Sequence, residues 1–78
     1  MGRQHFAPAP GKIYESCGGG KYLCQFFYKD TAGMIDINFG WAFEAHGCGI
    51  YPDGKIDWDY STMGHFEEIP MNLTKAED

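Results

Sequence analysis

This 78-residue sequence has little positive charge, which narrows the classes of protein it can belong to. It carries 6 Lys and Arg residues against 11 Asp and Glu residues, a formal net charge of −5. Non-specific nucleic-acid binding depends on basic side chains that neutralise phosphates, so direct nucleic-acid binding is disfavoured. The acidic excess lies in residues 51–78, and it favours a protein partner with a basic surface, or serves solubility alone.

The sequence also lacks long apolar runs and any convincing helical pattern. Its first residues have no apolar signal-peptide core, and no run approaches the about 20 apolar residues of a membrane-spanning helix. We therefore expect a cytoplasmic protein with no membrane partner. Three cysteines, an odd number, are consistent with reduced thiols in that compartment.

Aromatic residues and a regular alternation are what the sequence has in abundance. We expect some of its six Phe, five Tyr and two Trp to lie at a partner site, at a dimer interface or along the edges of a small barrel. From residue 34 to residue 46 apolar and polar residues alternate, which predicts a strand with one buried face. Gly40 is the expected bend, dividing the run into strands 34–39 and 41–46. The side chains expected on the buried face are Ile35, Ile37, Phe39, Trp41, Phe43 and Ala45.

Further short strands and tight turns indicate an all-β fold. The turn at 51–55 contains Pro, Asp and Gly in a hairpin order, and the alternation resumes over 55–60. We predict a small antiparallel SH3-like barrel or a strongly curved sheet of about five to six strands, with an OB-like or simple meander sheet as the alternative. The other expected strands cover 12–16, 21–29 and 65–68, joined by turns at 17–20, 30–33 and 61–64. The expected organisation is a flexible arm at 1–10, a β domain at 11–69 and a tail at 70–78.

Residues of the types that bind zinc are present, but their spacing is not that of a zinc site. Structural zinc sites usually bring their ligands in close pairs, and only His46 and Cys48 form such a pair. We therefore predict that the protein holds neither a metal nor another cofactor. The residues of zinc-binding type are Cys17, Cys24, His46, Cys48 and His65.

A thiol nucleophile is the second candidate for chemistry. Glu44, His46 and Cys48 occupy alternate positions, so on a regular strand they would share one face. A Cys beside a His is necessary for such a nucleophile, but an oriented base and an oxyanion site are needed as well. The chain offers no second loop that would hold a substrate. We therefore predict that the protein is not an enzyme.

The candidate binding face is acidic and aromatic. Asp57 and Asp59 share the polar face of their expected strand, near Tyr51 and Tyr60. We predict that this face meets Lys or Arg of a protein partner, with self-association as a homodimer as a structural alternative. A nucleotide-type ligand, stacked on tyrosines and bound by the backbone amides of 17–20, is a further alternative. The predicted binding residues are Tyr51, Asp57, Asp59, Tyr60, Glu44 and His46.

Two stretches carry a resemblance to other proteins. They are Gly-Trp-Ala-Phe-Glu-Ala-His-Gly-Cys at 40–48 and Tyr-Pro-Asp-Gly-Lys-Ile-Asp-Trp-Asp-Tyr-Ser at 51–61. Through them, residues 11–68 resemble small uncharacterised proteins of Gram-positive bacteria and of their phages and mobile elements. The resemblance brings no established activity. Its setting implies an inhibitor of a host defence system, a role that small acidic proteins of mobile elements often have.

Overall fold

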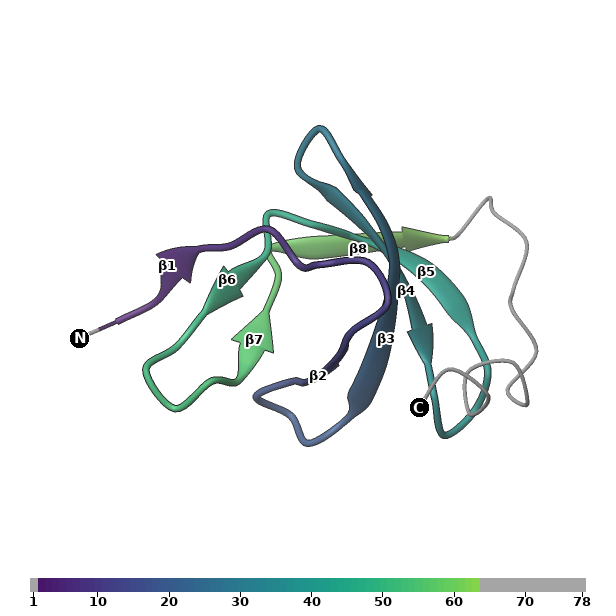
Figure 1. Ribbon diagram of the computed structural model, residues 1–78, viewed down its shortest axis with the longest axis horizontal. Coiled ribbons are helices and arrows are strands. Elements are labelled where there is room, and N and C mark those ends of the chain that lie inside the picture. Colours follow the sequence, from purple (N-terminus) through teal and green to yellow (C-terminus); the bar gives the residue numbers. More distant parts are fainter. Residues whose placement is uncertain (1, 64–78) are drawn as a thin grey trace.

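A computed structural model describes residues 2–63 of the chain. Within that range every regular element is a β-strand, and the strands form two antiparallel sheets (Figure 1). The prediction of an all-β fold is confirmed for these residues. The five-stranded sheet has the order β2 (Ile13–Glu15), β3 (Lys21–Tyr28), β4 (Thr31–Asp36), β5 (Ala42–His46) and β8 (Tyr60–Met63). The three-stranded sheet has the order β1 (Gln4–His5), β6 (Gly49–Ile50) and β7 (Ile56–Asp57).

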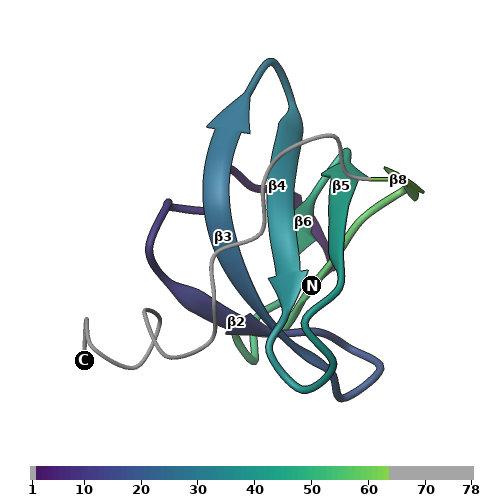
Figure 2. The ribbon, with the colours of Figure 1, turned by 90° about the vertical axis from the view of Figure 1, so that its right-hand side faces the viewer.

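The two sheets do not close into a barrel within residues 2–63. The larger sheet is a meander from β2 to β5, and β8 returns to pair with β5 after the chain has passed through the smaller sheet. A β-bulge between Cys24 and Phe26 interrupts the register of β3, and β3 and β4 curve visibly (Figure 2). A strongly curved sheet therefore describes the fold better than the predicted SH3-like barrel. In the described part of the chain, no helix has the length and apolar character needed to cross a bilayer.

The turn between β3 and β4 is shorter than predicted. It consists of Lys29 and Asp30 alone, which both have positive φ, at 51° and 64°, between the paired residues Tyr28 and Thr31. Two consecutive residues with positive φ match the twist of the flanking strands in a two-residue hairpin, and Asp tolerates that conformation better than most residues. β4 consequently begins at Thr31, inside the segment predicted as a turn.

The long alternating stretch is a hairpin and not a strand with a bend. β4 ends at Asp36, and β5 begins at Ala42 after a complete reversal. The Asp36 carboxylate accepts hydrogen bonds from the backbone amides of Asn38, at 2.9 Å, and Phe39, at 3.2 Å. Gly40 completes the turn with a φ of +80°. A side chain that bonds its own backbone two and three residues ahead stabilises a turn, and this effect outweighed the strand pattern.

This reversal changes which residues share a face of the sheet. Met34 is paired with Phe43, so an even position of β4 lies on the same face as an odd position of β5. Ile35, paired with Ala42, is buried on the opposite face. The prediction that all the odd positions share one buried face is therefore wrong, because the turn shifts the parity of the alternation.

The prediction of the core is most clearly wrong at Phe39 and Trp41. Their side chains are 72% and 70% exposed, whereas the alternation placed both on the buried face. They belong to the β4–β5 turn, beyond the last paired residues of the sheet. Their rings lie beside one another, with centroids 5.8 Å apart.

The core lies between the two sheets and is walled by aromatic rings. Tyr22, Phe43 and Trp58 pack against one another with ring centroids 5.3 to 5.4 Å apart. The contacts of Tyr22 with Phe43 and Trp58 are edge-to-face, an arrangement that adds stability beyond the area it buries. The completely buried side chains that these rings enclose are Cys24, Ala32, Met34, Ala45, Cys48 and Ile56.

The predicted strand at 55–60 is divided between the two sheets. Ile56 and Asp57 form β7, whereas Tyr60 begins β8, and Trp58 between them packs into the aromatic wall. The segment predicted as a turn at 61–64 continues β8 as far as Met63. The predicted strand at 65–68 and the tail at 70–78 lie outside the described residues.

The N-terminal segment, predicted as a flexible arm, carries a strand. Gln4 and His5 pair with β6, and the Phe6 amide donates to the Cys48 carbonyl at 3.0 Å. Pro8 is completely buried. Backbone hydrogen bonds and burial therefore tie this segment to the smaller sheet.

The exposure of Trp41 and the burial of Ile56 predict very different losses of stability when each side chain is truncated. Trp41→Ala should change the free energy of unfolding by about 0.5 kcal/mol or less, the range of surface substitutions. Ile56→Ala should cost about 2–5 kcal/mol, because Ile56 is completely buried and a cavity would remain. Urea unfolding of both variants measures the difference. A large loss of stability in Trp41→Ala would contradict the exposed position of that ring.

Candidate functional site

The predicted acidic face is occupied by a cation from the chain itself. Nε of Arg3 lies 2.5 Å from Oδ1 of Asp57, and a terminal nitrogen of Arg3 lies 3.1 Å from Oδ1 of Asp59. The same guanidinium donates a short hydrogen bond to the Gly47 carbonyl. Tyr51 donates its hydroxyl proton to Oδ2 of Asp57 at 2.8 Å. We call these five residues the Arg3 cluster.

Two glycines give Arg3 its path across the smaller sheet. β6 lies between β1 and β7, and Gly49 is the register partner of both His5 and Asp57. A Cβ atom on Gly49 would collide with the Arg3 side chain, so the missing side chain is what opens the path. Gly47 has a φ of +71°, and a Cβ there would collide with the Asp59 carboxylate. The cluster therefore depends on glycine at both positions.

The electrostatics of the Arg3 cluster favour an ionised Asp57. Partial burial acts to raise the pKa of Asp57, but the hydrogen bonds from Arg3 and Tyr51 outweigh it and the pKa is lowered. The hydrogen bond to Asp57 raises the pKa of Tyr51, so the phenol keeps its proton. Asp57 is thus a structural anion that ties three segments of the chain together.

A second group of predicted residues surrounds His46 on the larger sheet. Nδ1 of His46 lies 3.0 Å from the Thr31 hydroxyl, and Nε2 lies 2.9 Å from the Thr62 hydroxyl. Thr62 donates to a Glu44 oxygen at 3.4 Å. Because a hydroxyl has a single proton to donate, Nε2 is then the donor to Thr62. The Tyr60 ring stacks on the imidazole with centroids 4.6 Å apart. We call this set the His46 group.

The structure thus divides the six predicted binding residues into two sets. Tyr51, Asp57 and Asp59 belong to the Arg3 cluster, and Glu44, His46 and Tyr60 belong to the His46 group. The two sets adjoin, since the Asp59 amide donates to the His46 carbonyl at 2.9 Å. Sequence reasoning missed Arg3, Thr31 and Thr62, because each comes from a segment distant in the sequence and no spacing signal links them.

The arrangement proposed for a thiol nucleophile is not assembled. Glu44 and His46 do share a face of β5, but the positive φ of Gly47 turns the chain before Cys48. Cys48 is completely buried in the core, and both ring nitrogens of His46 are bonded to threonines. Burial, with smaller contributions from Asp30 and other groups, raises the pKa of the Cys48 thiol to about 11. A protonated, enclosed thiol is a poor nucleophile.

The residues of zinc-binding type are dispersed. Among residues 2–63, no three Cys, His, Asp or Glu side chains are placed so that they could hold a metal ion together. Cys17 is exposed, and Cys24 lies in the core with its pKa raised by burial to about 11. His65 falls outside the described residues.

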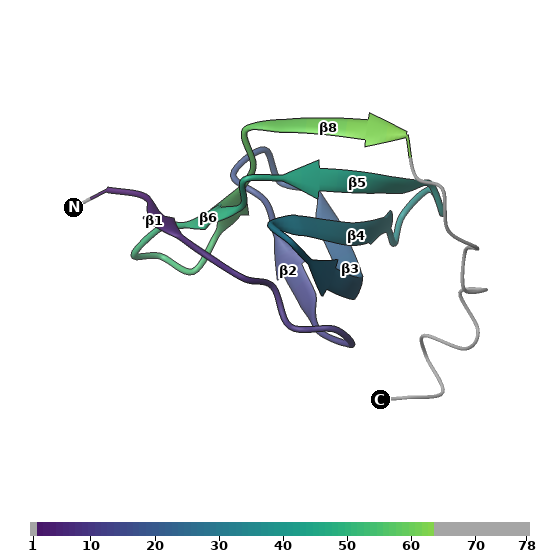
Figure 3. The same ribbon diagram turned by 90° about the horizontal axis from the view of Figure 1, so that it is seen from above.

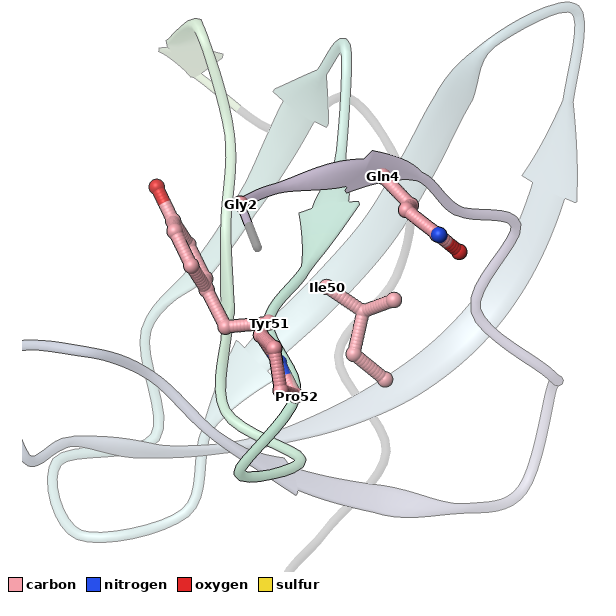
Figure 4. A pocket seen from close by; sticks show the side chains of 5 residues that line it. All are labelled: Gly2, Gln4, Ile50, Tyr51 and Pro52. Carbon is pink, nitrogen blue, oxygen red and sulfur yellow. The ribbon is translucent and has the colours of Figure 1, made fainter.

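The features proposed for a nucleotide-type ligand are weak. Gly19 donates its amide to the Ser16 carbonyl and Gly20 donates to the Ser16 hydroxyl, so these two amides of the 17–20 loop are already bonded. A recess of about 220 Å³ lies beside β6 (Figure 4), which is below the about 300–1,000 Å³ of typical ligand pockets. The residues that line it are Gly2, Gln4, Ile50, Tyr51 and Pro52.

Three apolar side chains gather at one end of the larger sheet. Phe39 and Trp41 lie in the β4–β5 turn. Met63 is 76% exposed and lies at the same end of the sheet, because its register partner, Phe43, follows Trp41 by two residues. We call Phe39, Trp41 and Met63 the apolar end. The location of the apolar end was not predicted, because the alternation assigned both aromatic rings to the core.

The Arg3 cluster makes stability depend on pH in a defined direction. Because the pKa of Asp57 is lowered in the folded state, its contribution is fully present above the unfolded value of about 3.9 and is lost as the pH falls through the folded value. Asp57→Asn should therefore be less stable than the wild type at pH 7 and approach it in acid. Thermal unfolding between pH 7 and pH 2 measures this. Arg3→Met should reduce the pH dependence as well, and parallel curves for all three proteins would refute the assignment.

The burial of two thiols predicts their reactivity. In the native protein at pH 8, one equivalent of thiol should react rapidly with a disulfide reagent, at the exposed Cys17. Cys24 and Cys48 should react only on unfolding, because they are buried and their pKa values are raised. The Cys17→Ser variant should show no rapid reaction. Rapid reaction of a second equivalent would contradict the enclosed core.

No family model, no curated protein and no solved structure matches this chain. Function must therefore be argued from the arrangement of the residues themselves.

Proposed function

We propose that this protein is a small, non-enzymatic module that binds a protein partner, and that its apolar end anchors the partner. The observation that carries the proposal is the exposure of Phe39, Trp41 and Met63, each at least 70% accessible to solvent. These large apolar side chains do not contribute to the core. Exposed apolar groups that gather at one place on a small protein often mark an interaction site.

The local structure suits an anchor. Trp is among the residue types that contribute most to protein interfaces, and aromatic side chains lose little entropy when they are fixed. The turn is already ordered by the hydrogen bonds of Asp36, and the rings of Phe39 and Trp41 are in contact before any partner arrives. Such preorganisation lowers the entropic cost of binding.

Acidic residues have a supporting role in this proposal. Arg3 already holds Asp57 and Asp59, so these two acids offer a basic partner less charge than the sequence suggested. The net charge of −5 still attracts a basic surface over a distance and raises the rate of encounter. The nucleotide-type alternative has less support, since the amides of Gly19 and Gly20 are internally bonded.

The biological setting is part of the proposal and rests on the resemblance alone. In that setting the protein acts in the cytoplasm of a Gram-positive bacterium, encoded by a phage or mobile element. Its partner there is a component of a host defence system, and binding inhibits that component.

The apolar end is tested by comparing two variants that each change exposed aromatic residues. The double variant Phe39→Ser, Trp41→Ser removes the anchor, and Tyr28→Ser changes a ring that is 67% exposed and lies beside the opposite end of β4, where Tyr28 pairs with Thr31. A partner captured from host lysate by the wild-type protein is identified by mass spectrometry and purified. We expect its affinity to fall more than about tenfold for the double variant, the effect of losing one hot-spot residue, and to be unchanged for Tyr28→Ser.

Circular dichroism and urea unfolding establish that both variants are folded before affinity is compared. Equal affinity of the wild-type protein and the folded double variant would remove the apolar end from consideration. An equal loss in Tyr28→Ser would show that aromatic content, and not this location, determines the binding.

A further inference from the structure

β8 is an edge strand with no neighbour on its outer side among the described residues. It pairs with β5 along one side (Figure 3). All four of its residues are exposed. An edge strand presents a row of unpaired backbone N–H and C=O groups, which can pair with another extended segment. The strand is preformed, so a partner would add to an ordered template.

The sequence of β8 carries none of the usual protection against such pairing. Natural edge strands are commonly blocked by Lys, by Pro or by other charged side chains. β8 reads Tyr-Ser-Thr-Met and contains none of these. The other edges differ: β2 includes Glu15, β7 includes Asp57, and β1 is only two residues long. Of the four edges that the structure describes, β8 is the one most open to strand addition.

The two sides of β8 differ in chemistry. Thr62 is paired with Glu44 and Tyr60 with His46, so these four residues share one face of the sheet. Met63 is paired with Phe43 on the opposite face, which continues toward the apolar end. A strand added beside β8 would alternate in the same way, with one set of side chains beside Tyr60 and Glu44 and the other beside Met63.

The polar side of β8 is suited to a cation. Within residues 2–63, no Lys or Arg forms an ion pair with Glu44, whose carboxylate accepts only from Thr62. Tyr60 stacks one ring face on His46 and is 61% exposed. A cation over an exposed tyrosine ring is attracted by its quadrupole, and a carboxylate within reach adds an ion pair.

We propose that β8 receives an extended segment of the partner protein, in which Lys or Arg alternates with apolar residues. The basic residues lie over Tyr60 and reach Glu44, and the apolar residues lie beside Met63. This inference rests on the proposed function and specifies how the partner is recognised, by strand addition and not by contact with the apolar end alone.

The test uses a synthetic peptide, acetyl-Thr-Arg-Val-Arg-Val-Arg-Thr-amide, titrated into the ¹⁵N-labelled full chain. We expect saturable shifts of the amide resonances of Ser61, Thr62 and Met63. A second peptide with the same side chains carries N-methyl groups on its Arg and Val residues, which removes these backbone donors on both edges. It should bind more than about tenfold more weakly, because several backbone hydrogen bonds to β8 are lost.

Matched variants separate the ion pair from general attraction to an acidic protein. Glu44→Gln should weaken the arginine peptide severalfold at low salt and reduce the salt dependence of binding. Glu15→Gln, at the opposite edge of the sheet, should not change either quantity. A peptide with Glu in place of Arg should not bind. Equal binding of the N-methylated peptide, or shifts confined to residues outside β8 and β5, would overturn the inference.

Three further outcomes separate this inference from self-association and from the proposed function. Concentration-dependent shifts in β8 without peptide would show that a second copy of the chain occupies the edge, and would refute the basic segment. If the peptide does not bind β8 while the partner still requires Trp41, the inference fails and the proposed function stands. If the peptide binds β8 as expected but the partner is indifferent to Phe39 and Trp41, the anchor fails instead.

Discussion

The reversal of backbone direction at Gly47 is the constraint on which the two-sheet architecture depends. β5 ends at His46 in the larger sheet and β6 begins at Gly49 in the smaller one, so the chain must leave one sheet within two residues. A φ of +71° makes that change of direction, and the space a side chain would need is filled by the Asp59 carboxylate. The Gly47 carbonyl also accepts from Arg3, so the crossing point and the acidic cluster are one structure.

A short chain needs residues that serve more than one structural purpose in this way. A domain of fewer than 80 residues buries only about 60% of its unfolded surface, so its core needs support from other interactions. Here an aromatic wall closes the space between the sheets, and the contact between Arg3 and Asp57 ties the segment of β1 to β7 across the smaller sheet. The acids near residue 57 therefore contribute to the fold first, and their charge is available to a partner only in part.

The surface that remains free has two kinds of chemistry at adjacent places. The apolar end offers burial, and the outer edge of β8 offers backbone pairing beside the Glu44 carboxylate, which has no ion pair among residues 2–63. Met63 belongs to both, as the last described residue of the strand and a member of the apolar end. A partner strand added beside β8 would extend along the sheet toward Trp41. One partner segment would then contact both the outer edge of β8 and the apolar end.

The sequence by itself determined the all-β class, the aromatic content and the positions of several turns, because the alternation of residues and the conformations open to Gly, Pro and Asp are local properties. It did not determine that residues 31–46 reverse at Asp36, because a side-chain hydrogen bond to the turn and a strand pattern compete locally and only the paired register decides between them. The exposure of Trp41 follows from that register. The meeting of Arg3 with Asp57 was likewise decided by tertiary structure alone, since 54 positions separate them and only strand order, with a glycine between, brings the charges together.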